Sequence, residues 1–162
     1  MERIWAPWRI EFITKAKSNV CIFCEEGDDR DLLILRRTPL VRVVLNRYPY
    51  VNGHLMVVPV RHTGELDSLT EAETLELFRT VALCREVLSR ASGPDGFNIG
   101  INLGKAAGAG VPDHLHVHVV PRWSGDNNFM SVVADTRVLP EALTATYDRL
   151  LPYFAQVASS LA

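Results

Sequence analysis

Three histidines in one short segment alternate with single apolar residues, and this spacing restricts the local fold more than any other feature of the chain. Side chains alternate across a β-strand, so an extended backbone places His114, His116 and His118 on one face and the apolar residues on the other. On an α-helix the same residues would spread over about 200° and share no site. We therefore predict a strand over 113–122 that displays a row of imidazoles and whose pairing ends at Pro121.

The composition is that of an ordinary globular domain. With 162 residues the chain is long enough for one core and too short to expect two, so 1–162 is predicted to be a single domain. Its 17 Lys and Arg against 19 Asp and Glu provide no bulk positive field for nucleic acid. No apolar run resembles a signal peptide or a membrane span. Three cysteines, an odd number, do not make a disulfide framework, so we expect a cytoplasmic protein. From the charge balance and the lack of long apolar runs, we expect that it binds neither nucleic acid nor membranes.

Within this domain we distinguish three parts. Residues 1–20 contain two tryptophans and are predicted to form an N-terminal arm that packs on the domain or on a second subunit. The core, with the histidine segment, covers 21–123, and 124–162 form a C-terminal extension.

Short β-rich runs predict strands at 32–35, 41–45 and 54–58. A further strand is predicted at 97–104. Because it precedes the histidine segment and is joined to it by one loop, we expect the two to pair antiparallel. Its two faces differ, one being apolar (Phe97, Ile99, Ile101, Leu103) and the other small and amide-bearing (Asn98, Gly100, Asn102, Gly104). The second face would lie beside the imidazole row.

Two helices complete the expected elements. Thr70 and Glu73 have the spacing of a capping box, and a helix is predicted to run from there to about Ala91. We expect its buried face to hold the apolar residues that keep helical spacing (Leu75, Phe78, Ala82, Leu83, Val87), with charged residues outside. A second helix is predicted over 140–153.

The histidine row has three physical interpretations. A purely polar outer face is disfavoured, because the neighbouring glycines and amides would build a site. A three-histidine metal centre is disfavoured because the first and third residues lie about 13 Å apart along a strand. The third is nucleophilic attack on phosphorus by a neutral imidazole held in one tautomer. We favour this interpretation, with His116 as the nucleophile, because it has a histidine on either side.

These residues resemble the motif of the histidine triad (HIT) family, which has three histidines separated by apolar residues. The segment 46–59, with Gly53 before His54, and the asparagine-containing strand at 97–104 are also similar to that family. The resemblance extends over about residues 20–123. In addition, the arm at 5–9 and the residues 121–130 resemble the bacterial branch that is associated with diadenosine tetraphosphate phosphorylase.

The resemblance implies an α+β fold with an antiparallel sheet of about five strands, a long helix and a C-terminal helix. It also implies a homodimer and nucleotidyl transfer through a covalent nucleotidyl-histidine. By the same resemblance His116 attacks the α-phosphorus of a nucleotide substrate, with His54, His114 and His118 completing the catalytic set. It further implies two substrate-binding asparagines, Asn46 near the ribose and Asn102 near the phosphates.

The loop between the last two predicted strands is a second candidate substrate contact. Backbone amides from Gly104 to Gly110 and the Lys105 ammonium are placed to stabilise charge on the transferred group. A solvent-exposed role for Lys105 is equally compatible with the sequence. Many relatives that cleave phosphoramidates have Gln-Ser where this chain has Gly110 and Val111, which favours dinucleoside polyphosphates as substrates.

The pair Cys21 and Cys24 is compatible with a redox site, a metal site or neither. The acidic residues that follow oppose a stabilised thiolate but not a dication. Related proteins place structural zinc on two cysteines and two histidines, which here implies Cys21, Cys24, His62 and His114. The alternative is an unmetallated pair with His62 on the surface.

The leading functional hypothesis is an enzyme that cleaves diadenosine polyphosphates. Phosphate as acceptor makes it a phosphorylase and water makes it a hydrolase; the family branch favours the former. A Mg²⁺ or Mn²⁺ ion with the substrate is compatible with the polyphosphate charge. The alternatives are a phosphoramidate or adenylyl-conjugate hydrolase, a nucleotide-binding module without turnover, and a zinc-stabilised interaction protein.

Overall fold

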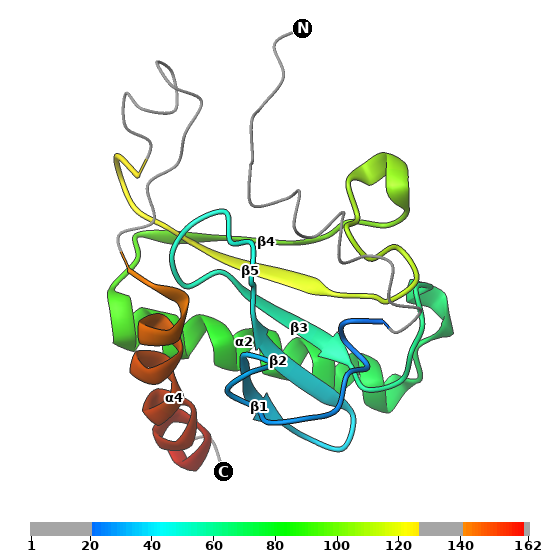
Figure 1. The fold of residues 1–162 in the computed structure, drawn as a ribbon, viewed down its shortest axis with the longest axis horizontal. Helices are drawn as coiled ribbons and strands as arrows, with labels where there is room; N and C mark the ends of the chain where they lie inside the picture. The colour runs from blue at the N-terminus through cyan, green and yellow to red at the C-terminus, as the bar shows by residue number, and fades with distance from the viewer. Residues whose placement is uncertain (1–20, 127–140, 161–162) are drawn as a thin grey trace, which may run out of the picture.

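One antiparallel sheet organises the protein (Figure 1). The structure is a computed structural model that describes residues 21–126 and 141–160. The strands lie in the order β1-β2-β3-β5-β4. Their bounds are Ile34–Arg37 for β1, Val41–Leu45 for β2, Leu55–Pro59 for β3, Gly96–Ile101 for β4 and Val117–Arg122 for β5. The expected α+β class and the five-stranded antiparallel sheet are confirmed, whereas the N-terminal arm and the tail residues 127–130 lie outside the described residues.

The long helix α2 (Glu71–Ser92) covers one face of the sheet, behind the strands in Figure 1. The capping box is confirmed, since the Thr70 side chain accepts a hydrogen bond from the Glu73 amide and the Glu73 side chain accepts one from the Thr70 amide. The predicted buried face is partly confirmed: Leu83 and Val87 are buried, whereas Leu75 and Phe78 are 53% and 54% exposed. This helix has apolar residues on more than one side, and the side that packs on the sheet also includes residues that were not predicted (Leu77, Val81, Leu88).

The strand β5 starts later than predicted, and its pairing continues past Pro121. His114 and His116 precede the ladder, where the Leu115 amide donates to the Thr63 carbonyl at 2.6 Å. Pro121 does not end the pairing, because it lies opposite Phe97 of β4. On the other side of β5, the pairing with β3 extends only to Val119, which lies opposite Leu55, the first residue of β3. Pro121 is therefore paired on one side only, where a proline is tolerated.

The edge strand β4 also departs from expectation. It pairs antiparallel with β5, as predicted, but its apolar face is only partly covered. Phe97 and Ile101 pack against the core, whereas Ile99 is 46% exposed and Leu103, beyond the strand, is 48% exposed. The reason is that α2 contacts β2, β3 and β5 and does not extend over the sheet edge.

The C-terminal helix α4 (Leu143–Ser160) packs on α2 and β1 and is longer than predicted. Pro152 lies inside it, although a proline usually ends a helix. Buried Leu150 and Phe154 anchor the helix in the core, and the Tyr147 hydroxyl donates to the Ile34 carbonyl at 3.0 Å. Two short 3-10 helices, η1 (Leu66–Ser68) and η2 (Lys105–Ala107), lie in the connections. Neither long helix in the described ranges has the length and hydropathy needed to cross a membrane.

Candidate active site

The sheet brings four of the five histidines together on the face opposite α2. Val117 and Val119 point into the core, so His118 between them faces the other way, opposite Met56 of β3. The ring of His118 lies 4.9 Å from that of His116 and 5.1 Å from that of His54. His54, from the loop before β3, is fully buried, as is His114.

His116 is held in one tautomer by its own backbone neighbour. Its Nδ1 atom lies 2.8 Å from the His114 carbonyl oxygen, which can only accept a hydrogen bond. Burial lowers the pKa of His116, so the ring is neutral near pH 7. The proton therefore resides on Nδ1, and Nε2 carries a free lone pair. This is the arrangement that an imidazole nucleophile requires.

The tautomers of His54 and His118 follow from a similar argument. The Tyr50 amide donates to Nδ1 of His54 at 3.1 Å, so His54 carries its proton on Nε2. That nitrogen lies 2.9 Å from Nδ1 of His118, which must accept, and His118 in turn carries its proton on Nε2. Both rings are neutral: burial lowers the pKa of His54 to about 3 and that of His118 to about 4. The buried Nε2 of His118 has no partner within the described residues.

Asn46 and Tyr50 complete the surroundings of His54. The Tyr48 amide donates to Oδ1 of Asn46, which turns the Nδ2 group toward His54 Nδ1 at 3.2 Å. The Tyr50 ring packs against both His54 and His118, with centroids 4.7 and 5.8 Å away. Asn46 lies beside His54, and its predicted contact with the ribose stays a prediction. Tyr50 was not predicted, because the sequence showed only that it lies in a loop.

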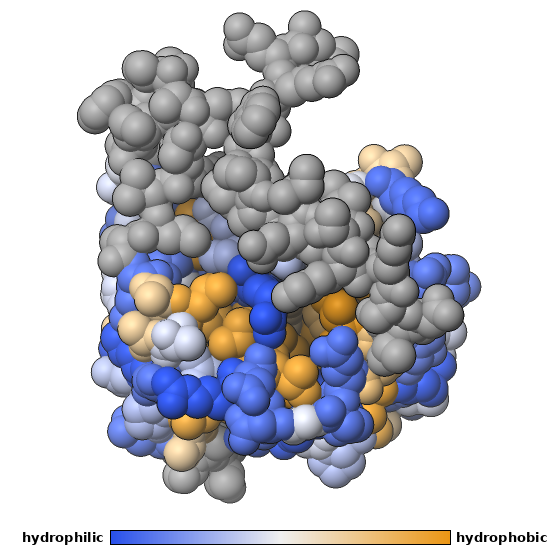
Figure 2. All heavy atoms as spheres, in the orientation of Figure 1, coloured by the Kyte–Doolittle hydropathy of each residue, from blue (hydrophilic) through white to orange (hydrophobic). Residues whose placement is uncertain are grey.

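Phe23 is a second residue that sequence reasoning missed. Its ring lies 5.4 Å from that of His114 and 5.2 Å from that of His116. It is buried with Met56 and Val58 in a small apolar cluster on the histidine side of the sheet. Figure 2 shows hydrophobic side chains in the middle of the visible part of this face, with hydrophilic ones around them. The nucleophile candidate thus has an apolar wall.

The two cysteines lie beside His62 and His114. The four ligand atoms lie within 4.8 Å of one another, and His114 Nδ1 is 3.4 Å from Cys21 Sγ and 3.2 Å from His62 Nδ1. A tetrahedral zinc site with bonds of about 2.0–2.3 Å has ligand separations of about 3.3–3.8 Å, so this donor set fits the ion. His114 Nε2 donates to the Pro59 carbonyl at 2.9 Å, which leaves Nδ1 free to bind a metal.

The redox alternative for the cysteine pair is disfavoured. The pKa of Cys24 is raised, first by burial and second by the neighbouring Cys21, whereas a reactive redox thiol needs a lowered pKa.

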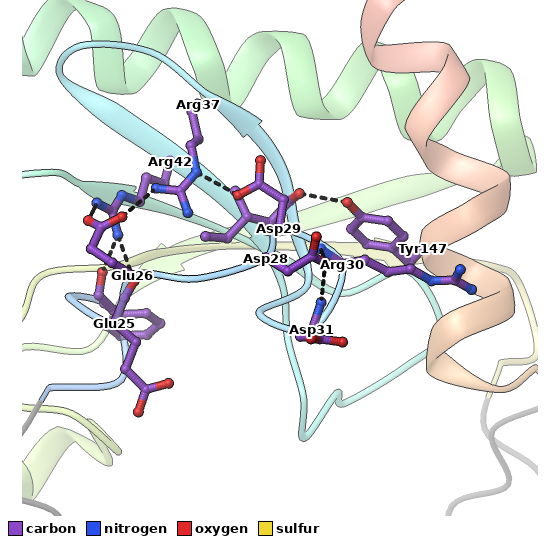
Figure 3. Close-up of polar contacts among 11 residues, drawn as sticks. Glu25, Glu26, Asp28, Asp29, Arg30, Asp31, Arg37, Arg42 and Tyr147 are labelled. Atoms are coloured by element: carbon purple, nitrogen blue, oxygen red, sulfur yellow. Dashed lines mark hydrogen bonds and ion pairs between the residues drawn. The ribbon is translucent and has the colours of Figure 1, made fainter.

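Arg42 holds the cysteine turn on the sheet (Figure 3). Its buried guanidinium donates to the carbonyl oxygens of Phe23 and Glu25 at 3.2 and 3.3 Å and pairs with the Glu26 carboxylate. Arg37 adds an ion pair with Asp29 at 2.6 Å. Two of the acidic side chains after the cysteines, Glu26 and Asp29, therefore have structural partners.

The predicted phosphate loop lies apart from these contacts. Asn102 follows the end of β4, and because Ile101 pairs with Val117, it continues the register toward His116. Gly104, Lys105 and Gly110 are exposed. The Gly108 and Ala109 amides bond to carbonyls within the loop, so they are engaged already. The proposed roles of this loop stay predictions.

Comparison with known proteins identifies relatives in sequence. The family model named HIT domain matches residues 29–125. The AP-4-A phosphorylase of Mycobacterium tuberculosis is 41% identical over 157 residues, which cover 90% of this chain and 80% of that protein. The bis(5'-nucleosyl)-tetraphosphatase [asymmetrical] of Schizosaccharomyces pombe is 37% identical over 93 residues, 57% of this chain and 50% of that protein.

Solved structures agree with the fold. A Zn-bound histidine triad family protein from Mycobacterium smegmatis superposes with a TM-score of 0.65 and 26% identity, covering 79% of this chain and 87% of that one. A hypothetical histidine triad nucleotide-binding protein from Sulfolobus tokodaii gives a TM-score of 0.66 at 26% identity, covering 87% and 93% of the two chains.

The buried imidazoles predict a pH-dependent stability. The folded pKa values of His54 and His118, about 3 and about 4, lie below the ordinary 6.5, so only the unfolded chain takes up protons between these limits. Their contribution is complete above about pH 6.5 and is lost as the pH falls toward the folded values, by at most about 1.4 kcal/mol per pH unit and group. Urea unfolding at several pH values measures this slope. The variant His118→Gln should reduce it, and an unchanged slope would contradict the assignment.

Proposed function

This chain belongs to the HIT domain family, and we propose that it is an enzyme that cleaves diadenosine polyphosphates, diadenosine tetraphosphate in particular. The observation that carries the proposal is the hydrogen bond from His116 Nδ1 to the His114 carbonyl, which presents the Nε2 lone pair. The relative named AP-4-A phosphorylase, to which the chain is similar over most of its length, supports the substrate class.

In the proposed reaction His116 Nε2 attacks the α-phosphorus of one adenylyl group. A P–N bond forms while the bond to the bridging oxygen breaks, and the remaining adenosine polyphosphate leaves. The Nε2 proton of His118 has no partner within the described residues and is available to the bridging oxygen as it gains charge. Asn46 and Asn102 are proposed to contact the ribose and the phosphates. The Lys105 ammonium, with the amides of Gly104 and Gly110, is proposed to stabilise charge on the transferred group.

A second step releases the adenylyl group from His116 to an acceptor. Inorganic phosphate as acceptor yields ADP, and water yields AMP. We propose phosphate, because the relative with 41% identity is named as a phosphorylase. A Mg²⁺ or Mn²⁺ ion bound to the polyphosphate is part of the proposal only as a companion of the substrate.

One assay tests both the chemistry and the acceptor. With diadenosine tetraphosphate and inorganic phosphate, we expect ADP and ATP to form, and we expect no turnover without phosphate. The variant His116→Asn lacks the nucleophile and should lose at least about a thousandfold in turnover while its nucleotide affinity stays within about tenfold. Chromatographic separation of the products measures each outcome. Formation of AMP and ATP without phosphate would show that the enzyme is a hydrolase and not a phosphorylase. The absence of turnover in both conditions would contradict the enzyme proposal.

We also propose that Cys21, Cys24, His62 and His114 hold a structural zinc ion. A closed four-ligand site supplies rigidity and no open position for chemistry. It would tie the N-terminal turn, including Phe23, to the residue two positions before His116. The fit of the donor atoms and the zinc-bound relative support the assignment.

The variant Cys24→Ser should lower the zinc content from about one ion per chain to near zero, because serine is a poor zinc ligand. Cys84→Ala is the matched control, since Cys84 is buried in the core away from the cluster and its loss should leave the metal in place. Elemental analysis after dialysis measures both. Wild-type protein that holds no zinc after supplementation would contradict the proposal.

A homodimer is proposed as well. The edge strand β4 and the exposed apolar residues Ile99, Leu75 and Phe78 support an interface between copies. Light scattering should give twice the chain mass of 18.1 kDa, and a monomer mass would refute it. The cytoplasmic location stays a prediction from the cysteine content.

A further inference from the structure

The loop between β2 and β3 carries two proposed site residues, one at each end, and its ends are fastened together. The Asn46 amide donates to the His54 carbonyl at 2.9 Å, and the Asn46 side chain contacts the His54 ring. The amide of Tyr50, in the middle of the loop, fixes the tautomer of that ring. The position of this loop therefore determines where the Nε2–H group of His54 points, and so whether it can donate a hydrogen bond to His118 Nδ1.

The loop is placed by the residues just before His54. Gly53 has a φ of +77°, and a Cβ at this position would lie 3.2 Å from Leu88 Cδ2 of α2, so the backbone approaches the helix closely. Asn52 points to the beginning of α4, which lies beside the loop (Figure 1). Its Nδ2 group donates to Glu141 Oε2 at 2.9 Å, and its Oδ1 atom lies 3.0 Å from the buried Thr146 hydroxyl.

The group that receives Asn52 is itself fixed on several sides. Arg149 pairs with both oxygens of Glu141, Nε at 3.0 Å and Nη2 at 2.8 Å, and its Nη1 atom donates to Ser92 Oγ at the end of α2. The Thr146 hydroxyl lies 2.8 Å from Glu141 Oε2. These contacts lower the pKa of Glu141 to about 2, Arg149 being the main cause, so the carboxylate stays charged as an acceptor for Asn52. The Asn52 side chain is thus bound at the N-terminal end of α4 by groups that also bond to one another.

We propose that Asn52 and Glu141 are positioning residues for the active site: they set the loop so that His54 keeps His118 in the tautomer with its proton on Nε2. The inference rests on the proposed function of the histidine site. Glu141, Thr146 and Arg149 lie beyond residue 125, where the HIT domain match ends, so part of the site geometry comes from the C-terminal extension. If the loop moved, His118 Nδ1 would lose its donor and the ring would be free to exchange tautomers.

The test compares Asn52→Ala, Glu141→Ala and Glu141→Gln with Asp148→Asn. Asp148 is the matched control, because it lies on the same helix in an exposed ion pair with Arg30 at 2.6 Å, away from the loop. Long-range ¹H–¹⁵N NMR of the histidine rings reports the tautomers directly. We expect the His54 and His118 signals to shift toward mixed tautomers in Asn52→Ala and Glu141→Ala, to change less in Glu141→Gln, and to be unchanged in Asp148→Asn.

Kinetics give a second readout. The kcat for diadenosine tetraphosphate should fall about tenfold to a hundredfold in Asn52→Ala, with a smaller change in KM, since displacement of a catalytic group mainly affects the reacting step. A folded Asn52→Ala protein with wild-type His54 and His118 signals would overturn the positioning proposal. Wild-type protein without turnover would overturn the proposed function instead, and the NMR comparison would still decide the role of Asn52. Should Glu141→Ala fail to fold, Asn52→Ala decides the question alone.

Discussion

The hydrogen bond between His116 Nδ1 and the His114 carbonyl is the interaction on which the proposed chemistry depends. A neutral imidazole has two interchangeable nitrogens, and only a fixed partner at one of them makes the other a dependable nucleophile. Here that partner is a backbone atom two residues away, so its position is set by the chain itself. The price is conformational: residues 114–116 must leave the regular ladder of β5, which starts at Val117.

The contacts around His116 also help to keep its ring neutral and in place. Burial keeps the rings neutral, Phe23 packs on His116 from one side, and His118 approaches it from the other. Each histidine has a different partner at its second nitrogen: the Pro59 carbonyl for His114, the His114 carbonyl for His116, and His54 for His118. His116 thereby carries its proton on Nδ1, whereas His114 and His118 carry theirs on Nε2.

The sequence contained the parts of the site that depend on local spacing. The capping box at Thr70 is confirmed, and the four predicted metal ligands lie together (Cys21, Cys24, His62, His114). Of the three histidines predicted to lie in one strand, only His118 lies within β5, although its ring contacts that of His116. The contacts between elements that are far apart in the sequence could not be predicted from it. The buried side of α2 could not be fully chosen from its own residues, and β5 starts at Val117, opposite the last residue of β4, Ile101. Phe23 and Tyr50 have no pattern of their own; they matter because folding lays them against the imidazoles.

The contact between Asn52 and Glu141 joins positions 89 residues apart in the sequence. A chain that is synthesised from its N-terminus presents all five strands and α2 before α4 exists. The sheet and its histidines can therefore assemble on a nascent chain, while the loop that carries His54 still lacks its contacts with Glu141 and Thr146. Docking of α4 then completes the surroundings of His54 after the elements that precede it in the chain.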